Sequence, residues 1–171
     1  MNRYLKAALS FGLLGGGLSF LGFLIIYWLG IEPISMNLII GYVIAPVFVF
    51  FAVKNFRDNY NGGTLYFGHG MTVGFFTYTI IALLASLYIF GMLHLDQDLF
   101  INFRQINLEL MGNNEEMLKE GLSEQAYEET YENISKMTIF DVAVNDFLRK
   151  IFSGLFFTII ISIILKRTVE F

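Results

Sequence analysis

Four long apolar stretches dominate the pattern of hydrophobic and polar positions along the 171-residue chain. Residues 7–31 and 34–53 carry no charged side chain, and residues 59–95 contain no acidic or basic residue other than histidine. A helix needs about 20 apolar residues to cross the hydrocarbon core of a bilayer. The pattern therefore predicts a small protein that crosses the membrane several times.

The fourth stretch, residues 151–165, contains only 15 residues between Lys150 and Lys166. At 1.5 Å per residue it would rise about 22 Å, which is less than the core thickness of about 30 Å. We therefore extend this helix upstream and expect it to run unbroken from Ile139 to Arg167. Because backbone groups must be satisfied inside the bilayer, each stretch is expected to be a helix. The predicted fold is an all-α polytopic membrane protein with transmembrane helices at residues 7–31, 34–53, 68–92 and 142–165.

The segment 95–138, between the third and fourth membrane helices, is predicted to be an insert of three short helices. Its first part has apolar residues at helical spacing: Leu99, Phe103, Ile106 and Leu110. We expect Gly112 to end this helix and Asn113 with Glu116 to form a capping box for a second one. Ser123 is predicted to cap a third helix that runs to about Met137.

The third short helix of the insert is predicted to be amphipathic. One face carries an apolar stripe and the other is acidic: Tyr127, Tyr131 and Ile134 opposite Glu128, Glu129 and Glu132. We interpret the acidic face as solvated, with attraction of a basic partner or of divalent cations as the alternative.

Composition and motifs exclude several classes of function. Apolar residues make up 56% of the chain and charged residues only 15%, which argues against a water-soluble domain. The chain has no cysteine, and none of the common nucleophile, phosphate-loop or metalloprotease motifs occurs. The two histidines, His69 and His94, are predicted to lie at opposite membrane faces. We therefore expect no enzymatic activity, no cofactor, no metal site and no nucleic-acid partner.

The distribution of Lys and Arg predicts the orientation of the chain. Six of them fall in segments that share one side: Arg3, Lys6, Lys54, Arg57, Lys166 and Arg167. The segment 92–150 has 5 basic and 12 acidic residues, a net charge of -7. The positive-inside rule then places both termini in the cytoplasm and the insert outside it. Arg149 and Lys150 are an exception to this rule, because they adjoin the fourth membrane helix on the side that the rule places outside the cytoplasm.

Small residues at spacings of four indicate where the membrane helices touch. The rows are Gly12 and Gly16, Gly15 and Ser19, Gly41 and Ala45, Gly70 and Gly74, and Gly154, Thr158 and Ser162. We interpret them as contacts within one bundle, with the face of a homodimer as the alternative.

The start of the fourth membrane helix holds the densest group of polar side chains near the membrane: Asp141, Asn145, Asp146 and Arg149, followed by Lys150. One interpretation is a polar vestibule that binds a ligand or an ion. The other is a solvated helix extension in which Asp146 pairs with Arg149 at low energetic value. We expect the solvated arrangement.

The loop between the second and third membrane helices is predicted to be structural. Arg57 and Asp58 are expected to pair or to cap helix ends there. Gly62 and Gly63 follow an asparagine in a strong turn signal, and Thr64 is expected to cap the third helix.

The chain resembles a bacterial family of small four-helix membrane proteins of unknown function, domain of unknown function 4199. The resemblance rests on the glycine-rich first helix, the acidic insert before the fourth helix, and three short motifs: Arg57-Asp58, Gly62-Gly63 and Lys166-Arg167. It implies a bacterial inner-membrane protein and an association with envelope glycosyltransferases. It supplies no catalytic residues.

Two hypotheses about function follow. The first is a non-enzymatic accessory protein of the inner membrane that docks a membrane-protein partner in the cell envelope, such as a glycosyltransferase. The alternative is a small transporter or lipid-binding protein that uses the polar group at the start of the fourth helix. A cation-coupled transporter needs an ionisable residue at mid-membrane, and the first three predicted helices have none there.

Overall fold

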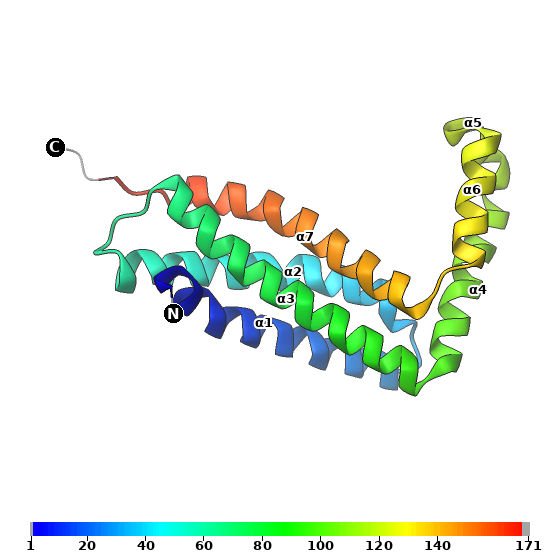
Figure 1. Ribbon diagram of the computed structural model, residues 1–171, viewed down its shortest axis with the longest axis horizontal. Helices are drawn as coiled ribbons and strands as arrows, with labels where there is room; N and C mark the ends of the chain where they lie inside the picture. The colour runs from blue at the N-terminus through cyan, green and yellow to red at the C-terminus, as the bar shows by residue number, and fades with distance from the viewer. Residues whose placement is uncertain (1, 169–171) are drawn as a thin grey trace. The chain divides into compact units, whose positions relative to one another are not determined.

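The computed structural model describes residues 2–168, and within them the fold is all-α. Four helices are long and apolar enough to cross a membrane: α1 (Arg3–Trp28), α2 (Pro33–Asn55), α3 (Phe67–Leu95) and α7 (Ile139–Ile164) (Figure 1). Between α3 and α7 the chain forms α4 (Gln97–Asn113), α5 (Glu115–Leu122) and α6 (Glu124–Ser135). The predicted fold class, four membrane helices with an insert of short helices, is confirmed.

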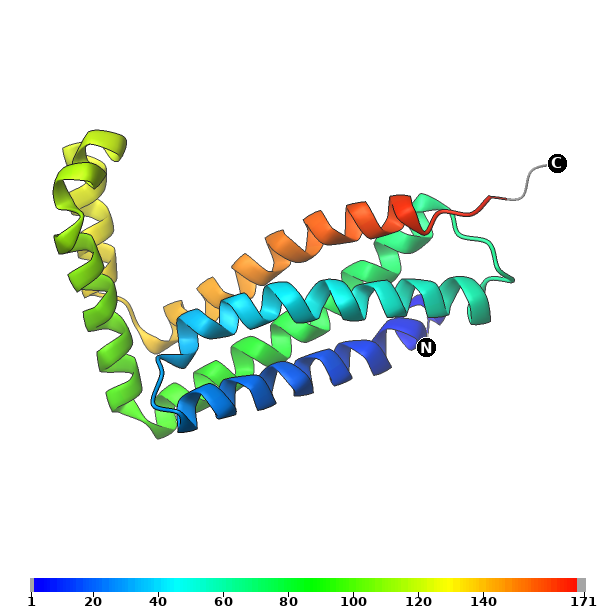
Figure 2. The same cartoon turned by 180° about the vertical axis from the view of Figure 1, so that it is seen from behind.

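The chain divides into two compact units, which we describe separately. One unit comprises residues 1–88 and 144–171, and it contains most of the four long helices. The other comprises residues 89–143, and it contains the three short helices of the insert. In the first unit, α1 and α2 lie side by side, as seen from behind in Figure 2.

Local sequence explains where α1 and α2 begin and end. The Asn2 side chain accepts a hydrogen bond from the backbone N–H of Tyr4 at 3.1 Å, so α1 begins at Arg3 rather than at residue 7. Gly30 adopts a left-handed φ of 71°, and α1 ends before it. The Glu32 carboxylate then caps α2 by accepting from the N–H groups of Ile34 and Ser35 at 2.6 and 2.9 Å.

The rows of small residues pack the long helices against one another. A Cβ added at Gly12 would lie 2.8 Å from Cβ of Ile80, so α1 and α3 are in close contact there. A Cβ at Gly70 would lie 2.6 Å from the Ser162 hydroxyl oxygen, which shows equally close packing of α3 on α7. Gly74 against Thr158 and Gly154 against Tyr78 repeat this contact along the same pair of helices. These positions therefore form close contacts between helices of the same chain, and the homodimer face stays the alternative interpretation.

The end of α7 differs from expectation. We predicted a helix to Arg167, but α7 ends at Ile164. The backbone of Arg167 instead exchanges two hydrogen bonds with that of Leu65, at 2.8 and 2.9 Å. Leu65 is fully buried, so its backbone groups need partners within the protein. The extended segment after α7 supplies them.

The boundaries within the insert were predicted only in part. Gly112 does not end α4, which continues to Asn113. The capping box at Asn113 and Glu116 is also wrong: α5 begins at Glu115, and its N-cap residue, Asn114, makes no side-chain cap. The Asn114 amide donates instead to the backbone carbonyl of Leu110 at 2.8 Å and so satisfies the end of α4. The predicted cap at Ser123 is confirmed, since its hydroxyl accepts from the N–H of Ala126 at 3.3 Å.

Few apolar side chains are buried in the insert. α6 packs against both α4 and α5. Leu99 and Tyr127 are the buried apolar residues among residues 97–135, and the Tyr127 ring stacks on Tyr131 with centroids 6.3 Å apart. The predicted stripe on the third short helix is therefore packed at Tyr127, while Tyr131 remains exposed.

Candidate functional site

A buried ion pair lies in the first unit, inside the group of long helices. Asp146 and Lys150 are one helical turn apart on α7, and they form a salt bridge. Asp146 is 5% exposed and Lys150 is 3% exposed, so both charges are removed from the lipid and from water. Burying two charges costs several kcal/mol for each ion before their attraction offsets the loss. Ionisable residues in this position mark candidate functional sites.

Two further side chains extend this ion pair across three helices. Asn37 on α2 donates from its amide nitrogen to Oδ1 of Asp146 at 3.5 Å. Tyr88 on α3 donates its hydroxyl proton to Oδ1 of Asn37 at 2.5 Å. We call Asn37, Tyr88, Asp146 and Lys150 the buried polar network. It ties α7 to α2 directly and to α3 through Asn37.

The surroundings of the network are apolar on the side of α1. The rings of Phe20 and Phe23 lie 5.1 and 5.4 Å from the ring of Tyr88. Gly41 on α2 leaves room for the methylene chain of Lys150, because a Cβ at Gly41 would lie 2.8 Å from Cε of that lysine. In such surroundings an ion pair is screened little and depends on its own hydrogen bonds.

Those hydrogen bonds are unevenly distributed over the Asp146 carboxylate. Oδ1 accepts from both Lys150 and Asn37. Oδ2 is buried and has no hydrogen-bond partner among the described residues. The site thus has one satisfied oxygen and one free acceptor.

The structure corrects the predicted arrangement at the start of the fourth helix. Asp141, Asn145 and Arg149 are exposed, whereas Asp146 is buried. The expected solvated pair of Asp146 and Arg149 is wrong. The partner of Asp146 is Lys150, because a separation of four residues keeps both side chains on the inward face of α7.

Asp141 has a local role. Its carboxylate accepts from the backbone N–H of Thr138 at 2.8 Å and from the Thr138 hydroxyl at 2.7 Å. These bonds lie outside the buried polar network. Asp141 therefore orders the start of α7.

Sequence reasoning missed Asn37 and Tyr88. Asn37 is a polar amide in the second turn of an otherwise apolar helix, and this isolated polar residue was a usable signal. Tyr88 carried no such signal, because tyrosines are common near membrane interfaces. Only the packing of α3 on α2 identifies it.

The loop after α2 brings its predicted residues together in a compact turn. Arg57 pairs with Asp58 at 2.7 Å within a short π-helical turn, Phe56–Tyr60. Gly62 and Gly63 have φ of 60° and 79°, and the N–H of Gly63 donates to the carbonyl of Arg57 at 2.8 Å. The predicted helix cap at Thr64 is wrong. Its hydroxyl donates to the carbonyl of Asn61 at 3.0 Å and closes the turn.

The two histidines are separate from each other. His69 lies among the rings of Tyr4, Phe56 and Tyr66, with its Nδ1 3.4 Å from the Asn61 amide nitrogen. His94 packs on Phe90 with centroids 4.3 Å apart. Across residues 2–168, no group of three or more His, Asp or Glu side chains is arranged to hold a metal ion.

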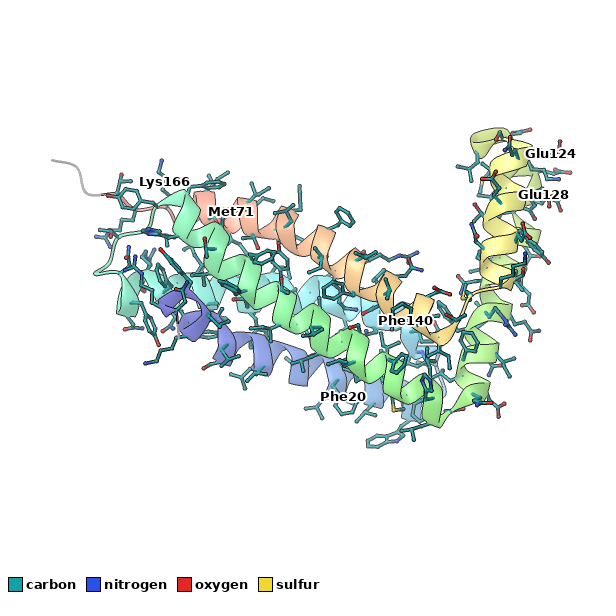
Figure 3. All side chains as sticks on the ribbon, viewed as in Figure 1. Phe20, Met71, Glu124, Glu128, Phe140 and Lys166 are labelled. Atoms are coloured by element: carbon teal, nitrogen blue, oxygen red, sulfur yellow. The ribbon has the colours of Figure 1, made fainter. Side chains whose placement is uncertain are left out.

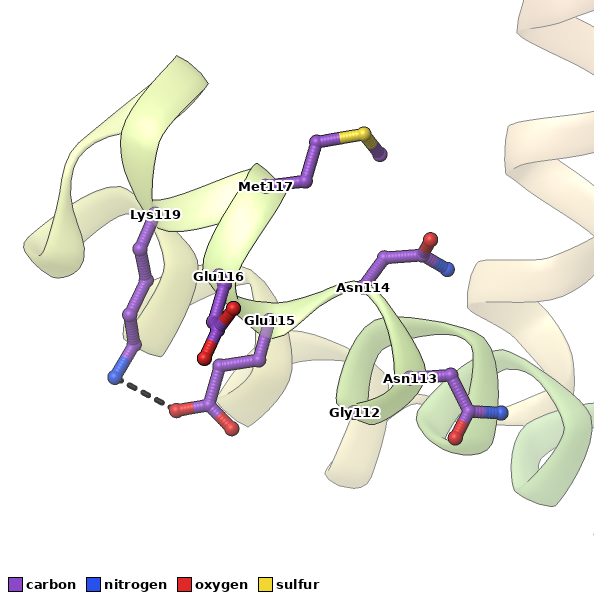
Figure 4. Close-up of a pocket in the computed structure, with 7 residues that line it drawn as sticks. All are labelled: Gly112, Asn113, Asn114, Glu115, Glu116, Met117 and Lys119. Atoms are coloured by element: carbon purple, nitrogen blue, oxygen red, sulfur yellow. Dashed lines mark ion pairs between the residues drawn. The ribbon is translucent and has the colours of Figure 1, made fainter.

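The insert contains an open polar pocket at the junction of α4 and α5 (Figure 4). It has a volume of about 600 Å³ and is lined by Gly112, Asn113, Asn114, Glu115, Glu116, Met117 and Lys119. Nζ of Lys119 lies 2.8 Å from the Glu115 carboxylate. The same nitrogen lies 3.5 Å from the Glu124 carboxylate and 3.8 Å from that of Glu128. The bond to Glu115 raises the pKa of Lys119 above its ordinary value. This lysine therefore stays charged.

Comparison with family models places both the buried polar network and the pocket within one matched region, residues 10–167. The chain belongs to the DUF4199 family. That family is described as a protein of unknown function. Neither the comparison with curated proteins nor the comparison with solved structures found a match for this DUF4199 protein.

Proposed function

We propose that this DUF4199 protein is a non-enzymatic accessory protein of the bacterial inner membrane, and that its insert docks a protein partner in the cell envelope. One observation carries the proposal. Large apolar side chains lie exposed on α4 and α5: Leu110 is 56% exposed, Met117 64% and Leu122 53%. Exposed apolar groups outside a membrane helix are typical of contact sites for other proteins.

The exposure follows from how the short helices pack. The apolar stripe of α4 is buried at Leu99, partly covered at Phe103 and open at Leu110. α5 presents Met117 and Leu122 to the outside and has no buried residue. A partner that covers these side chains would complete a core that the insert lacks.

The charge of the insert indicates the chemistry of the partner. Residues 95–138 hold ten acidic and three basic side chains. Glu124 and Glu128 project from the same side of α6 in Figure 3, and both are exposed. A basic rim around an apolar centre would fit this surface, and opposite charge would speed the encounter. The resemblance to the family makes a membrane glycosyltransferase the first partner to test.

This proposal places the insert outside the cytoplasm. It is supported by the basic residues at the opposite ends of the long helices, of which Lys166 and Arg167 are both exposed. Reporter fusions at Asn113 test it, since the expected result is activity of a periplasmic reporter. If only a cytoplasmic reporter is active, the predicted orientation is wrong. A partner that binds the insert outside the cytoplasm would then be excluded.

The docking surface is tested by purification in mild detergent. We compare the natural chain with a Leu110→Ser, Met117→Gln, Leu122→Ser variant and with a control, Gln105→Ala, Glu120→Gln, in which exposed polar residues of the same helices change. The natural chain and the control should retain a stoichiometric partner that added salt weakens, and the triple variant should lose it with unchanged helical content. Retention by all three proteins would contradict the proposed surface.

The buried polar network favours a second candidate function. A small transporter or ligand-binding membrane protein needs an ionisable group within the helices, and Asp146 with Lys150 supplies one. Native mass spectrometry of the purified protein tests this function. A retained lipid or small molecule that is lost in Asp146→Asn, but kept in Asp141→Asn, would support it. Identical spectra for all three proteins would argue against it.

A further inference from the structure

The two oxygens of the Asp146 carboxylate differ in their surroundings. Oδ1 accepts from the Lys150 ammonium and from the Asn37 amide. Oδ2 is equally shielded from solvent and has no partner within residues 2–168. A carboxylate oxygen that is buried without a donor carries a desolvation cost that a proton bound to that oxygen would lower.

We propose that Asp146 is a proton-binding site of this protein, and that the proton binds at Oδ2, the carboxylate oxygen other than the one that contacts Lys150 and Asn37. The inference rests on the second proposed function and names the ligand of its site. In this step a proton from water forms one O–H bond at Oδ2. No bond to carbon changes, and the charge of the Asp146–Lys150 pair rises from zero to +1.

The ionisable groups that face Asp146 come from two helices. α7 supplies Lys150 and, one residue earlier, the exposed Arg149, whose positive charge also acts on the Asp146 carboxylate. α3 supplies the phenol of Tyr88, and α2 supplies the neutral amide of Asn37. On α1, the apolar rings of Phe20 and Phe23 pack against the ring of Tyr88. Asp146 is therefore the single carboxylate of the network. Burial favours its neutral form, and the positive charges of Lys150 and Arg149 favour its ionised form.

The site is close enough to the helix ends for a proton to reach it. Asn37 is the fifth residue of α2, and Asp146 is the eighth residue of α7. At 1.5 Å per residue these positions lie about 6 to 10 Å from the first residue of their helices. The exposed residues Asn145 and Arg149 flank Asp146 along α7. The proton would reach the carboxylate along this polar edge.

Proton binding would change the contact between α7 and α2. The methylene chain of Lys150 lies against Gly41, where there is no side chain to hold it. Once Asp146 is neutral, the ammonium loses its counter-charge in apolar surroundings. The flexible lysine can then carry its charge toward the polar interface, as lysines near membrane interfaces commonly do. A proton at Oδ2 thus couples to the position of Lys150.

A membrane-permeant carbodiimide tests the proposal directly, since it reacts with protonated carboxyl groups in apolar surroundings. The full chain in liposomes is treated with dicyclohexylcarbodiimide at about pH 8 and at about pH 5. Both pH values lie between the ordinary pKa of Asp and that of Lys. Peptide mass spectrometry then measures modification of Asp146. An adduct on the carboxyl group and an amide formed with Lys150 by loss of water both count as modification.

We expect modification of Asp146 to be at least about tenfold greater at about pH 5 than at about pH 8, because the carbodiimide reacts with the protonated carboxyl group. Lys150→Met should increase modification at about pH 8, because it removes the counter-charge. The neighbouring exposed substitution Arg149→Met should have a smaller effect, and Asp141→Asn should have none. Asp146→Asn should abolish the modified peptide.

Three results would overturn the proposal: no modification of Asp146 at either pH, equal modification at both, or an effect of Arg149→Met as large as that of Lys150→Met. A permanently ionised pair that only clamps the helices gives the first of these. The result is separable from the second proposed function. Modification with pH dependence but without any retained molecule leaves the proton site standing and removes the wider ligand-binding function.

Discussion

The long helices and the insert place polar and apolar side chains in opposite ways. The long helices bury Asn37, Asp146 and Lys150 and expose apolar residues such as Leu14 and Phe152. The insert exposes most of its charges, and it also exposes Leu110 and Met117. An exposed leucine on a membrane helix contacts lipid and needs no explanation. The same exposure in an acidic segment between membrane helices is the observation on which we base the proposed docking surface.

The two regions also contain matched ion pairs. Asp146 with Lys150 on α7 and Glu132 with Lys136 on α6 both join an acidic residue to a lysine four positions later. The first pair is buried, and the second is exposed on both partners. The same local geometry therefore has different consequences, because burial decides whether loss of one partner leaves a charge without compensation.

The largest expected effect comes from breaking the buried pair. Lys150→Met should lower the free energy of unfolding in detergent by about 3 kcal/mol or more, because Asp146 is left charged or must take up a proton. Arg149→Met, one residue away and exposed, should change it little. The double variant Asp146→Asn, Lys150→Met should recover much of the loss. A single-variant effect no larger than that of Arg149→Met would remove the contrast between the two regions.

Close packing of α3 on α7 should give the next largest effect. A side chain at Gly74 would collide with Thr158, so Gly74→Val should cost about 1–3 kcal/mol through overpacking. Gly17 has nothing within 4 Å of an added Cβ and provides the control Gly17→Val. Thermal unfolding monitored by circular dichroism compares the two variants. Equal midpoints would mean that the row of small residues does not hold the bundle together.

The Arg57–Asp58 pair should have a smaller effect, because it lies at the end of α2 with a partly exposed arginine and a more exposed aspartate. Arg57→Ala and Asp58→Ala should each lower the unfolding midpoint slightly. If the residues act as a pair, the second substitution should cost less when the first is already present. Strict additivity in the double variant would leave no role for the pair.

The smallest expected effect concerns Glu132 in the insert. Its hydrogen bond and charge interaction with Lys136 lower the pKa of the carboxyl below the ordinary 4.5. A lowered pKa contributes stability that is present above the unfolded-state value and is lost as the pH falls through the folded-state value. The helicity of the natural chain should therefore fall slightly more than that of Glu132→Gln on acidification below about pH 4.5. High salt should reduce the difference, and a larger loss in Glu132→Gln would contradict it.

Much of the fold was readable from the sequence, because membrane helices must be long, apolar and uninterrupted. The need to lengthen the fourth helix upstream follows from the thickness of the bilayer, and the structure begins α7 at Ile139 as predicted. The end of that helix was not readable. The pairing of Arg167 with Leu65 joins residues far apart in the sequence, and no local signal indicates it.

The site was readable only in part. A spacing of four along α7 is compatible with Asp146 facing Lys150 and equally with Asp141 facing Asn145, and spacing alone does not say which face is buried. The small residue Gly41 leaves the room in which the Lys150 chain lies against α2, and this contact depends on how the two helices pack. Asn37 was visible as an isolated polar residue, but its two partners come from α3 and α7 and depend on how the helices pack.

Hydrogen–deuterium exchange of the protein in lipid nanodiscs tests the contrast between the two regions most directly. Buried, well-packed helices exchange slowly, and thinly packed ones open easily. We expect strong protection of the amides around Asp146 and Lys150 on α7 and rapid exchange in α5 and α6, with slowing in α5 when a docked partner covers Met117. Exchange around Asp146 as fast as in α5 would contradict the buried polar network and, with it, the division of roles between the long helices and the insert.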